Sequence, residues 1–107
     1  MQHLNDVKGK EIAPGLYGRF VHGKTMTLSF VDITKGSRLP EHSHPHEQIT
    51  FIMEGELEMT IGGEKMMLTK GMVHVIPGNV PHSALAHTDV KVLDCFHPVR
   101  EDYVIKD

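Results

Sequence analysis

The 107-residue sequence lacks several features that define whole classes of protein. Its only cysteine, Cys95, has no partner for an intrachain disulfide, which fits a reducing compartment. No apolar run is long enough to cross a membrane, and the N-terminal MQHLNDVKGKE lacks the apolar segment of a signal peptide. We therefore expect a cytoplasmic protein that does not associate with membranes.

Positive charge is not in excess either. The chain has 11 Lys and Arg against 14 Asp and Glu, a formal charge of -3, which argues against nucleic acid or an anionic membrane as a partner. The content of 39% hydrophobic and 23% charged residues is typical of a globular domain, and the length suits one core. We predict a single domain over residues 1–107, with a core at about 15–100 and a charged tail at 100–107.

Helical patterns are also missing, because Gly and Pro interrupt the chain every ten residues or so. Short runs with the composition of β-strands lie between these interruptions. Such spacing predicts an all-β sandwich or barrel. The runs are LYGRFV, TMTLSFVDI, QITFIM, ELEMTI, EKMMLT, MVHVIP, HSALAH and VKVLDCF.

Two short pairs, EG at 54–55 and GG at 62–63, are candidate two-residue hairpin turns. They would join QITFIM, ELEMTI and EKMMLT into one antiparallel sheet. Paired residues share a face, so Gln48 would lie on the same face as Leu57 and Met59. This arrangement predicts an apolar interior with a polar end at Gln48.

Nine histidines are the one compositional oddity, and three of them lie in HSHPHEQI, residues 42–49. His42 and His44 are two positions apart, so on an extended strand their imidazoles project to one face, as two ligands of one metal must. Gln48 has the same parity. A fourth ligand is expected from His82 in VIPGNVPHS, where a Pro-Gly turn and a second proline hold the chain.

The spacing of these residues resembles that of the cupin superfamily, which consists of small double-stranded β-helix (jelly-roll) barrels. The first cupin motif, G-x5-H-x-H-x3-E-x6-G, matches at Gly36, His42, His44 and Gly55, with Gln48 in place of the glutamate. The second, G-x5-P-x-G-x2-H, matches at Gly71, Pro77 and His82, with Asn79 in place of the middle glycine. Asparagine tolerates the left-handed backbone conformation that glycine adopts.

The resemblance implies a site for one divalent metal ion, Zn, Ni, Mn or Fe, bound by His42, His44, Gln48 and His82. Four neutral ligands would leave the full charge on the ion, which favours Lewis-acid chemistry over the oxygen chemistry of Fe(II) bound by two histidines and a carboxylate. Metal affinity is expected to fall below about pH 6, where ordinary histidines become protonated. His46 and Glu47 are expected to have supporting or surface roles, since Glu47 has the wrong parity.

A third group of residues lies in VKVLDCFHPVRED. Asp94 and Phe96 share one face of the last predicted strand, and Arg100 follows. Asp94 is a candidate general acid or base, Arg100 a candidate ligand for a substrate anion, and Phe96 a candidate apolar wall. The alternative is that Asp94 is exposed on an edge strand or pairs with Arg100.

This ending, together with HSHPHEQ and EGELEMTIGG, resembles the pectin-degradation cupins that linearise 4,5-unsaturated uronates. The resemblance implies that Asp94, Phe96 and Arg100 are catalytic and that the substrate is a small anionic molecule such as a sugar acid or a related keto acid. The sequence leaves open whether the protein is an enzyme, although the Asp94 group favours one. A non-catalytic cupin that senses or binds a small molecule and a metal-dependent dioxygenase are the alternatives.

The strand run that contains Gln48 has a second apolar face. Ile49, Phe51 and Met53 alternate with the residues expected to face the site. An apolar outer face of a small sheet is often covered by a second subunit. We therefore expect a homodimer.

Overall fold

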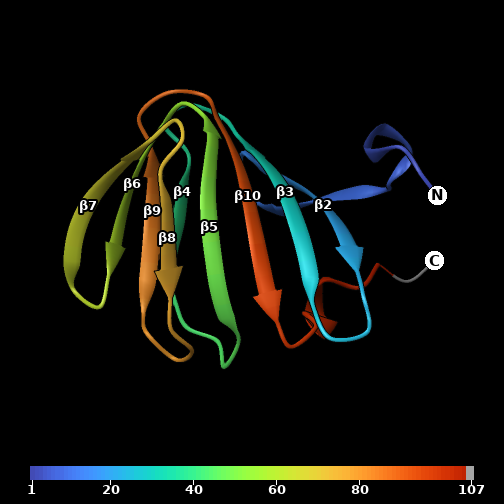
Figure 1. Cartoon of the computed structure of the whole chain (residues 1–107). Coiled ribbons are helices and arrows are strands. Elements are labelled where there is room, and N and C mark those ends of the chain that lie inside the picture. Colours follow the sequence, from blue (N-terminus) through green and yellow to red (C-terminus); the bar gives the residue numbers. More distant parts are fainter. Residues whose placement is uncertain (106–107) are drawn as a thin grey trace.

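A computed structural model describes residues 1–105 of the chain as two antiparallel sheets that face each other (Figure 1). This all-β arrangement confirms the fold class predicted from the sequence. The strands are β1 (Gly9–Ala13), β2 (Leu16–His22), β3 (Thr27–Ile33), β4 (Arg38–His42), β5 (Glu47–Glu54), β6 (Glu56–Ile61), β7 (Glu64–Thr69), β8 (Val73–Ile76), β9 (His82–Ala86) and β10 (Val90–His97). Two short 3-10 helices, η1 (Leu4–Asp6) and η2 (Glu101–Tyr103), flank them. Positions 106 and 107 of the predicted tail lie outside the described residues.

The two sheets are built from strands that are far apart in the sequence. One sheet has the order β1-β2-β3-β10-β5-β8 and the other the order β4-β9-β6-β7. β10, the last strand, lies between β3 and β5 in the middle of the larger sheet. The C-terminal part of the chain is therefore held beside the HSHPHEQI region.

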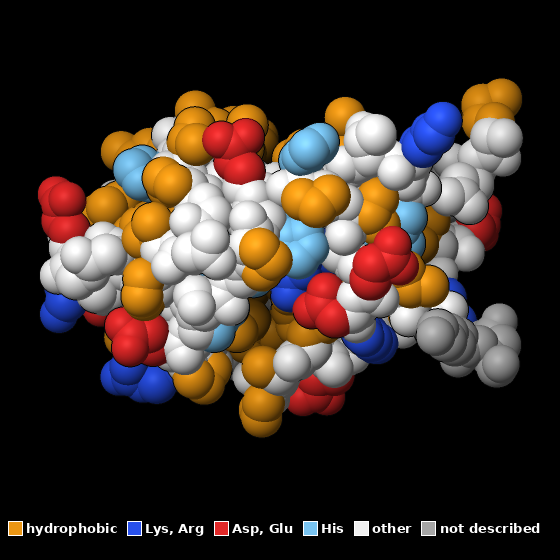
Figure 2. Space-filling view, turned by 90° about the horizontal axis from the view of Figure 1, so that it is seen from below, with side chains coloured by type: hydrophobic (Ala, Val, Ile, Leu, Met, Phe, Trp, Pro, Cys, Tyr) orange, Lys and Arg blue, Asp and Glu red, His pale blue; other side chains and the backbone are white. Residues whose placement is uncertain are grey.

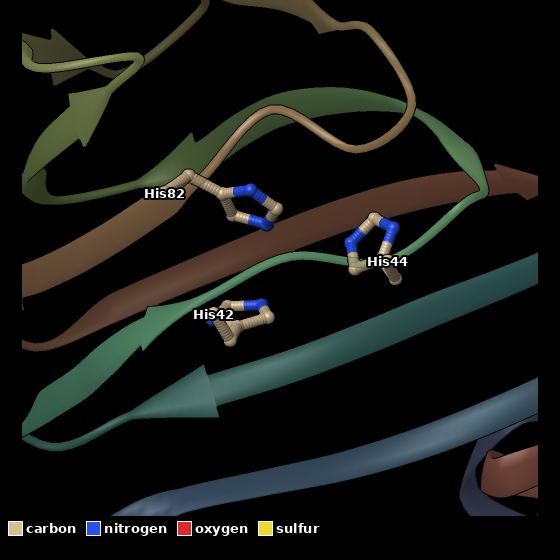
Figure 3. A group of neighbouring side chains, drawn as sticks. All are labelled: His42, His44 and His82. Atoms are coloured by element: carbon tan, nitrogen blue, oxygen red, sulfur yellow. The ribbon is translucent and has the colours of Figure 1, made fainter.

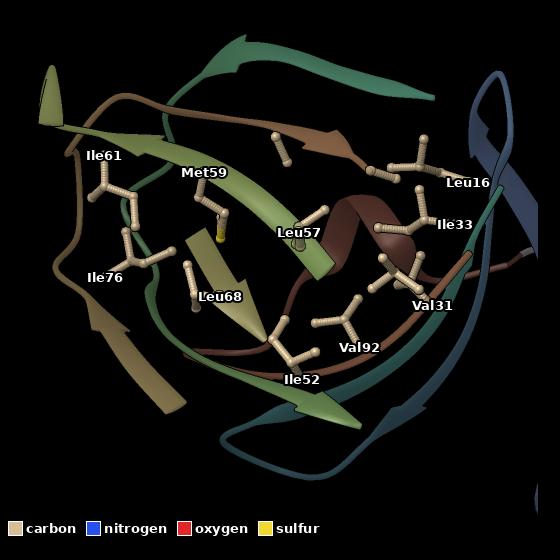
Figure 4. Packing of buried hydrophobic residues seen from close by; sticks show 13 residues of the cluster. Leu16, Val31, Ile33, Ile52, Leu57, Met59, Ile61, Leu68, Ile76 and Val92 are labelled. Atoms are coloured by element: carbon tan, nitrogen blue, oxygen red, sulfur yellow. The ribbon is translucent and has the colours of Figure 1, made fainter. Parts of the chain in front are cut away.

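Alternating side chains form the core between the sheets. On β5, Gln48, Thr50 and Ile52 are buried, whereas Ile49 and Phe51 point outward and are about 40% exposed, at 41% and 39%. This period of two is the pattern of a strand with one face on a core. The buried side chains that fill the interior include Leu16, Val31, Ile33, Ile52, Leu57, Met59, Ile61, Leu68, Ile76 and Val92 (Figure 4).

The predicted hairpin at 54–55 is wrong. β5 pairs with β10 and β8, whereas β6 pairs with β7 and β9, so the chain crosses from one sheet to the other at Gly55. Gly55 has φ +91°, and a Cβ there would collide with the carbonyl oxygen of Asp89. The expected faces are nevertheless right, because the Gln48 face of β5 and the Leu57 face of β6 are both buried and face the same core from opposite sheets.

The second predicted turn, at 62–63, is confirmed by the pairing of Leu57 with Leu68 across β6 and β7. Two strands were not predicted, β1 and β4, and both lie at sheet edges. β4 contains Pro40, which is tolerated at an edge where the ladder needs no N–H donor. Within residues 1–105, no helix is long and apolar enough to cross a membrane.

Candidate metal and catalytic site

Three imidazoles converge at one end of the barrel (Figure 3). His42 ends β4 and His82 begins β9, and the two residues are direct partners in the ladder between these strands. The spacing had predicted that His42 and His44 lie on one strand. His44 instead lies in the loop that follows β4. One ligand atom from each of the three histidines lies within 4.8 Å of the others.

The loop of His44 is held by the turn between β8 and β9. The N–H of Asn79 donates to the carbonyl oxygen of His44 at 2.7 Å, and Asn79 has the left-handed φ of 67° expected for this position. A Cβ at Gly78 would collide with the carbonyl oxygen of Pro45, so only glycine permits this close approach. The two cupin-like motifs therefore meet through their backbones.

Each of the three histidines is oriented by its own backbone neighbourhood. The Nδ1 atoms of His42, His44 and His82 lie 2.9, 3.1 and 2.9 Å from carbonyl oxygens two residues away. A carbonyl only accepts hydrogen bonds, so each Nδ1 carries the proton and each Nε2 presents a lone pair. The Nε2 atom of His82 is buried without a hydrogen-bond partner, which fits a metal ligand.

Burial favours the neutral form of two of these imidazoles, His44 and His82. Burial, with the nearby charge of Arg100 and the neighbouring His82, lowers the pKa of His44 from 6.5 to about 4. Burial also lowers the pKa of His82. Neutral imidazole is the form that binds a metal, so protons should compete at these two histidines only at lower pH than the ordinary value suggests.

Gln48 joins the histidines to the opposite sheet. Its Oε1 lies 3.1 Å from Nε2 of His44, and its side-chain amide donates to Oγ1 of Thr50 at 2.9 Å and to Oδ1 of Asp94 at 3.2 Å. The residue is only 6% exposed. Three imidazole nitrogens and an amide oxygen suit a borderline divalent ion such as Zn²⁺, so the residues present fit the metal that the sequence predicted.

Asp94 is neither exposed on an edge strand nor paired with Arg100, the two alternatives to a catalytic role. It lies on β10 in the middle of the larger sheet, and its carboxylate accepts hydrogen bonds from Thr50 at 2.8 Å and from Gln48, not from Arg100. Although solvent reaches part of the side chain, burial raises the pKa of Asp94 from 3.8 to about 6. A carboxyl group with such a pKa can exchange a proton near neutral pH.

Arg100 is buried against two aromatic rings. Its guanidinium carbon lies 4.6 Å from the ring centroid of Phe96 and 3.9 Å from that of Tyr103, and the residue is 5% exposed. Its Nε and Nη2 donate to the two carboxylate oxygens of Asp102 at 3.0 and 2.7 Å. Asp102 therefore occupies one edge of the guanidinium that was predicted to bind a substrate anion.

One cavity connects these groups. Its volume is about 40 Å³, enough for a few water molecules, and it is lined by core residues and by the polar residues His42, Gln48, Thr50, His82, Asp94, Arg100 and Tyr103, with Phe96 beside them. Viewed from this end, the molecule has histidine, basic and acidic side chains around a hollow with hydrophobic side chains at its base (Figure 2). All of the metal-ligand and catalytic candidates except His44 thus line one cavity.

The two other candidates in HSHPHEQI, His46 and Glu47, lie outside the set of metal ligands. The carbonyl oxygen of His46 accepts from Nδ1 of His44, and Nε2 of His46 lies 3.2 Å from the carbonyl oxygen of Val99. Glu47 is exposed, as its parity predicted. Sequence reasoning missed Thr50, Asp102 and Tyr103. Only Asp102 had a local signal, a carboxylate two positions after Arg100.

Comparisons with known proteins identify the family of the chain. The model of the Cupin domain family matches residues 29–96 of the chain. The pectin degradation protein KdgF of Dickeya dadantii is 33% identical over 76 residues, which cover 69% of this chain and 69% of that protein. The family match includes the HSHPHEQI segment and the region that carries the second motif.

Solved structures show the same fold. An RmlC-like cupin from Shewanella frigidimarina is 27% identical with a TM-score of 0.91, covering 97% of this chain and 95% of that chain. KdgF from a Halomonas species is 28% identical with a TM-score of 0.87, covering 94% of each chain. The motifs, the fold and the family match agree, and the chain belongs to the cupin family.

Proposed function

We propose that this cupin is a metal-dependent enzyme that linearises 4,5-unsaturated uronates to keto sugars. The observation that carries the proposal is the cavity in which His42 and His82, two of the three converging imidazoles, lie with Gln48, Asp94 and Arg100. The likeness to two KdgF proteins supports a sugar acid as substrate.

His42, His44, His82 and Gln48 would hold the ion, which when bound supplies a Lewis acid for sugar oxygens. Arg100 binds the substrate carboxylate, using donors that Asp102 leaves free or exchanging Asp102 for the substrate. Asp94 takes up and returns protons as the ring opens, for which a pKa of about 6 is suitable. Phe96 packs against the Arg100 guanidinium and holds it in place.

The test is incubation of the Zn²⁺- or Ni²⁺-reconstituted protein with 4,5-unsaturated galacturonate while the absorbance of the ring double bond is followed. Loss of that absorbance is the expected result. Asp94→Asn, assayed at saturating metal, should abolish turnover, whereas Asp32→Asn should not, because Asp32 is exposed and pairs with Lys91 on the outer face of the same sheet. Equal turnover by the two variants would refute the role of Asp94.

A non-catalytic cupin that binds a metal and a small anion is the second candidate. The observation that favours it is the ion pair of Arg100 with Asp102, which already fills one edge of the guanidinium. Binding of a uronate without loss of its double bond, measured by calorimetry and absorbance on one sample, would favour this function over the enzyme.

The outer face of the larger sheet supports a homodimer. Ile49 pairs with Val75 and Phe51 with Val73 across β5 and β8, and these four side chains are between 39% and 62% exposed. A second copy of the chain would cover this apolar surface. Light scattering tests it, and a monomeric mass would refute the dimer. The cytoplasmic location stays a prediction from the sequence.

A further inference from the structure

The hydrogen bonds around Gln48 fix which end of its amide faces the histidines. A carboxylate can only accept hydrogen bonds, so Oδ1 of Asp94 requires the nitrogen of the Gln48 amide on its side. The hydroxyl of Thr50 donates its only proton to the same Oδ1 at 2.8 Å, and its oxygen is then left to accept from Gln48. Both N–H groups of the amide are used on this side, and its oxygen points away.

The oxygen of that amide faces an atom that cannot donate to it. Nδ1 of His44 gives its proton to a carbonyl oxygen, so Nε2 of a neutral His44 is an acceptor, 3.1 Å from Oε1 of Gln48. Two lone pairs in contact are unfavourable unless a cation lies beside both of them. Two ligands each about 2.1 Å from one ion, at an angle of 90° to 109°, are about 3.0 to 3.4 Å apart.

We infer that Thr50 and Asp94 are positioning residues that hold the Gln48 amide with its oxygen toward the metal, so that a neutral glutamine binds where the carboxylate of the first cupin motif would otherwise bind. The buried Thr50 hydroxyl, 1% exposed, links the strand of the ligand to the strand of the carboxylate. The inference rests on the metal site of the proposed function but not on its substrate.

The difference between glutamine and glutamate explains why the orientation of the Gln48 side chain must be fixed by hydrogen bonds. Either oxygen of a carboxylate binds a metal, whereas an amide that turns over presents N–H groups and repels the ion. Without Thr50 and Asp94 the preferred orientation is the turned one, because the amide nitrogen would then donate to Nε2 of His44. Partners of this kind, when removed, cost about 10- to 100-fold in metal affinity.

The experiment measures Zn²⁺ affinity by competition with a chromophoric chelator, without any substrate. Thr50→Val keeps the shape of the side chain and removes the hydroxyl, and Thr50→Ser restores it. Ser29→Ala is the matched control, because Ser29 is also buried, pairs with Asp94 on the neighbouring strand and lines the same cavity. Gln48→Ala and the double variant Thr50→Val/Gln48→Ala complete a double-mutant cycle.

Thr50→Val should weaken Zn²⁺ binding at least about tenfold, whereas Thr50→Ser and Ser29→Ala should bind as the unmodified protein does. The double variant should bind no more weakly than Gln48→Ala alone, because Thr50 acts through Gln48. An unchanged affinity in Thr50→Val, additive losses in the cycle, or no Zn²⁺ binding by the unmodified protein would overturn the inference. A protein that binds Zn²⁺ as described but leaves uronates unchanged would refute only the proposed reaction.

Discussion

Asp94→Asn is predicted to stabilise the metal-free protein while it removes activity. A rise in the pKa of Asp94 from 3.8 to about 6 means that the ionised carboxylate destabilises the fold by about 3 kcal/mol well above pH 6. Asparagine removes the buried charge, and its Oδ1 can still accept from Thr50 and Gln48. A functional group that lowers stability is common at active sites.

The destabilisation by Asp94 should depend on pH in one direction. Below the folded-state pKa the native carboxyl binds its proton more readily than the unfolded one, so the destabilisation by Asp94 fades as the pH falls toward 3.8. The advantage of Asp94→Asn should be about 2 to 3 kcal/mol at pH 7.5 and about half of that at pH 5. Urea unfolding followed by circular dichroism, with a chelator present, measures both values.

The exposed Asp32→Asn is the control, and its effect on the free energy of unfolding should stay within about 0.5 kcal/mol at either pH. If Asp94→Asn were less stable than the unmodified protein at pH 7.5, or if its advantage did not change with pH, the assignment of a carboxylate destabilised by burial would be wrong.

Three further results are expected. Gly55→Ala should lower the free energy of unfolding by at least about 2 kcal/mol, because φ is +91° and the carbonyl oxygen of Asp89 blocks a Cβ. Chemical denaturation measures this change. An effect below about 0.5 kcal/mol, which is usual for surface substitutions, would contradict the geometry at which the chain crosses between the sheets. Arg100→Lys should raise the KM for an unsaturated uronate about tenfold or more, since lysine cannot make the bidentate contact or stack on Phe96. An unchanged KM in steady-state kinetics would refute the role of Arg100 in substrate binding. From pH 7 to pH 5, Zn²⁺ affinity should fall by far less than the roughly 10⁴-fold loss expected for three ordinary histidines, because burial lowers the pKa of His44 and of His82. Competition with a chelator at each pH measures the affinity. A full loss of roughly 10⁴-fold would contradict the neutral state of these two residues.

Much of the fold and part of the site could be predicted from the sequence because their signals are local. His42 and His44 are separated by one residue, and His82 follows a turn that contains two prolines, so spacing alone marks all three as ligand candidates. Strand runs between Gly and Pro give the all-β class. Alternation along β5 places Gln48 on the face opposite Ile49 and Phe51, although the strand pairing used to choose the inward face was wrong.

The errors have a common physical cause. EG at 54–55 has the local chemistry of a hairpin turn, but the choice between pairing β5 with β6 or with β10 depends on how two whole sheets close over one core. The sequence likewise gave no reason to single out Thr50, because threonine is an ordinary strand residue until a carboxylate and an amide from two strands meet it. The ion pair of Arg100 with Asp102 is local in the sequence, but its position beside the cavity depends on how η2 packs, with Tyr103 in the cavity lining.

The measurement that tests the central claim most directly is metal content by elemental analysis, made on the unmodified protein, on His42→Ala/His44→Ala and on the control His87→Ala. His87 contacts Glu58 on the outer face of the smaller sheet, away from the cavity. The account predicts about one divalent ion per chain in the unmodified protein and in the control, and none in the double variant. The same metal content in all three proteins would contradict it.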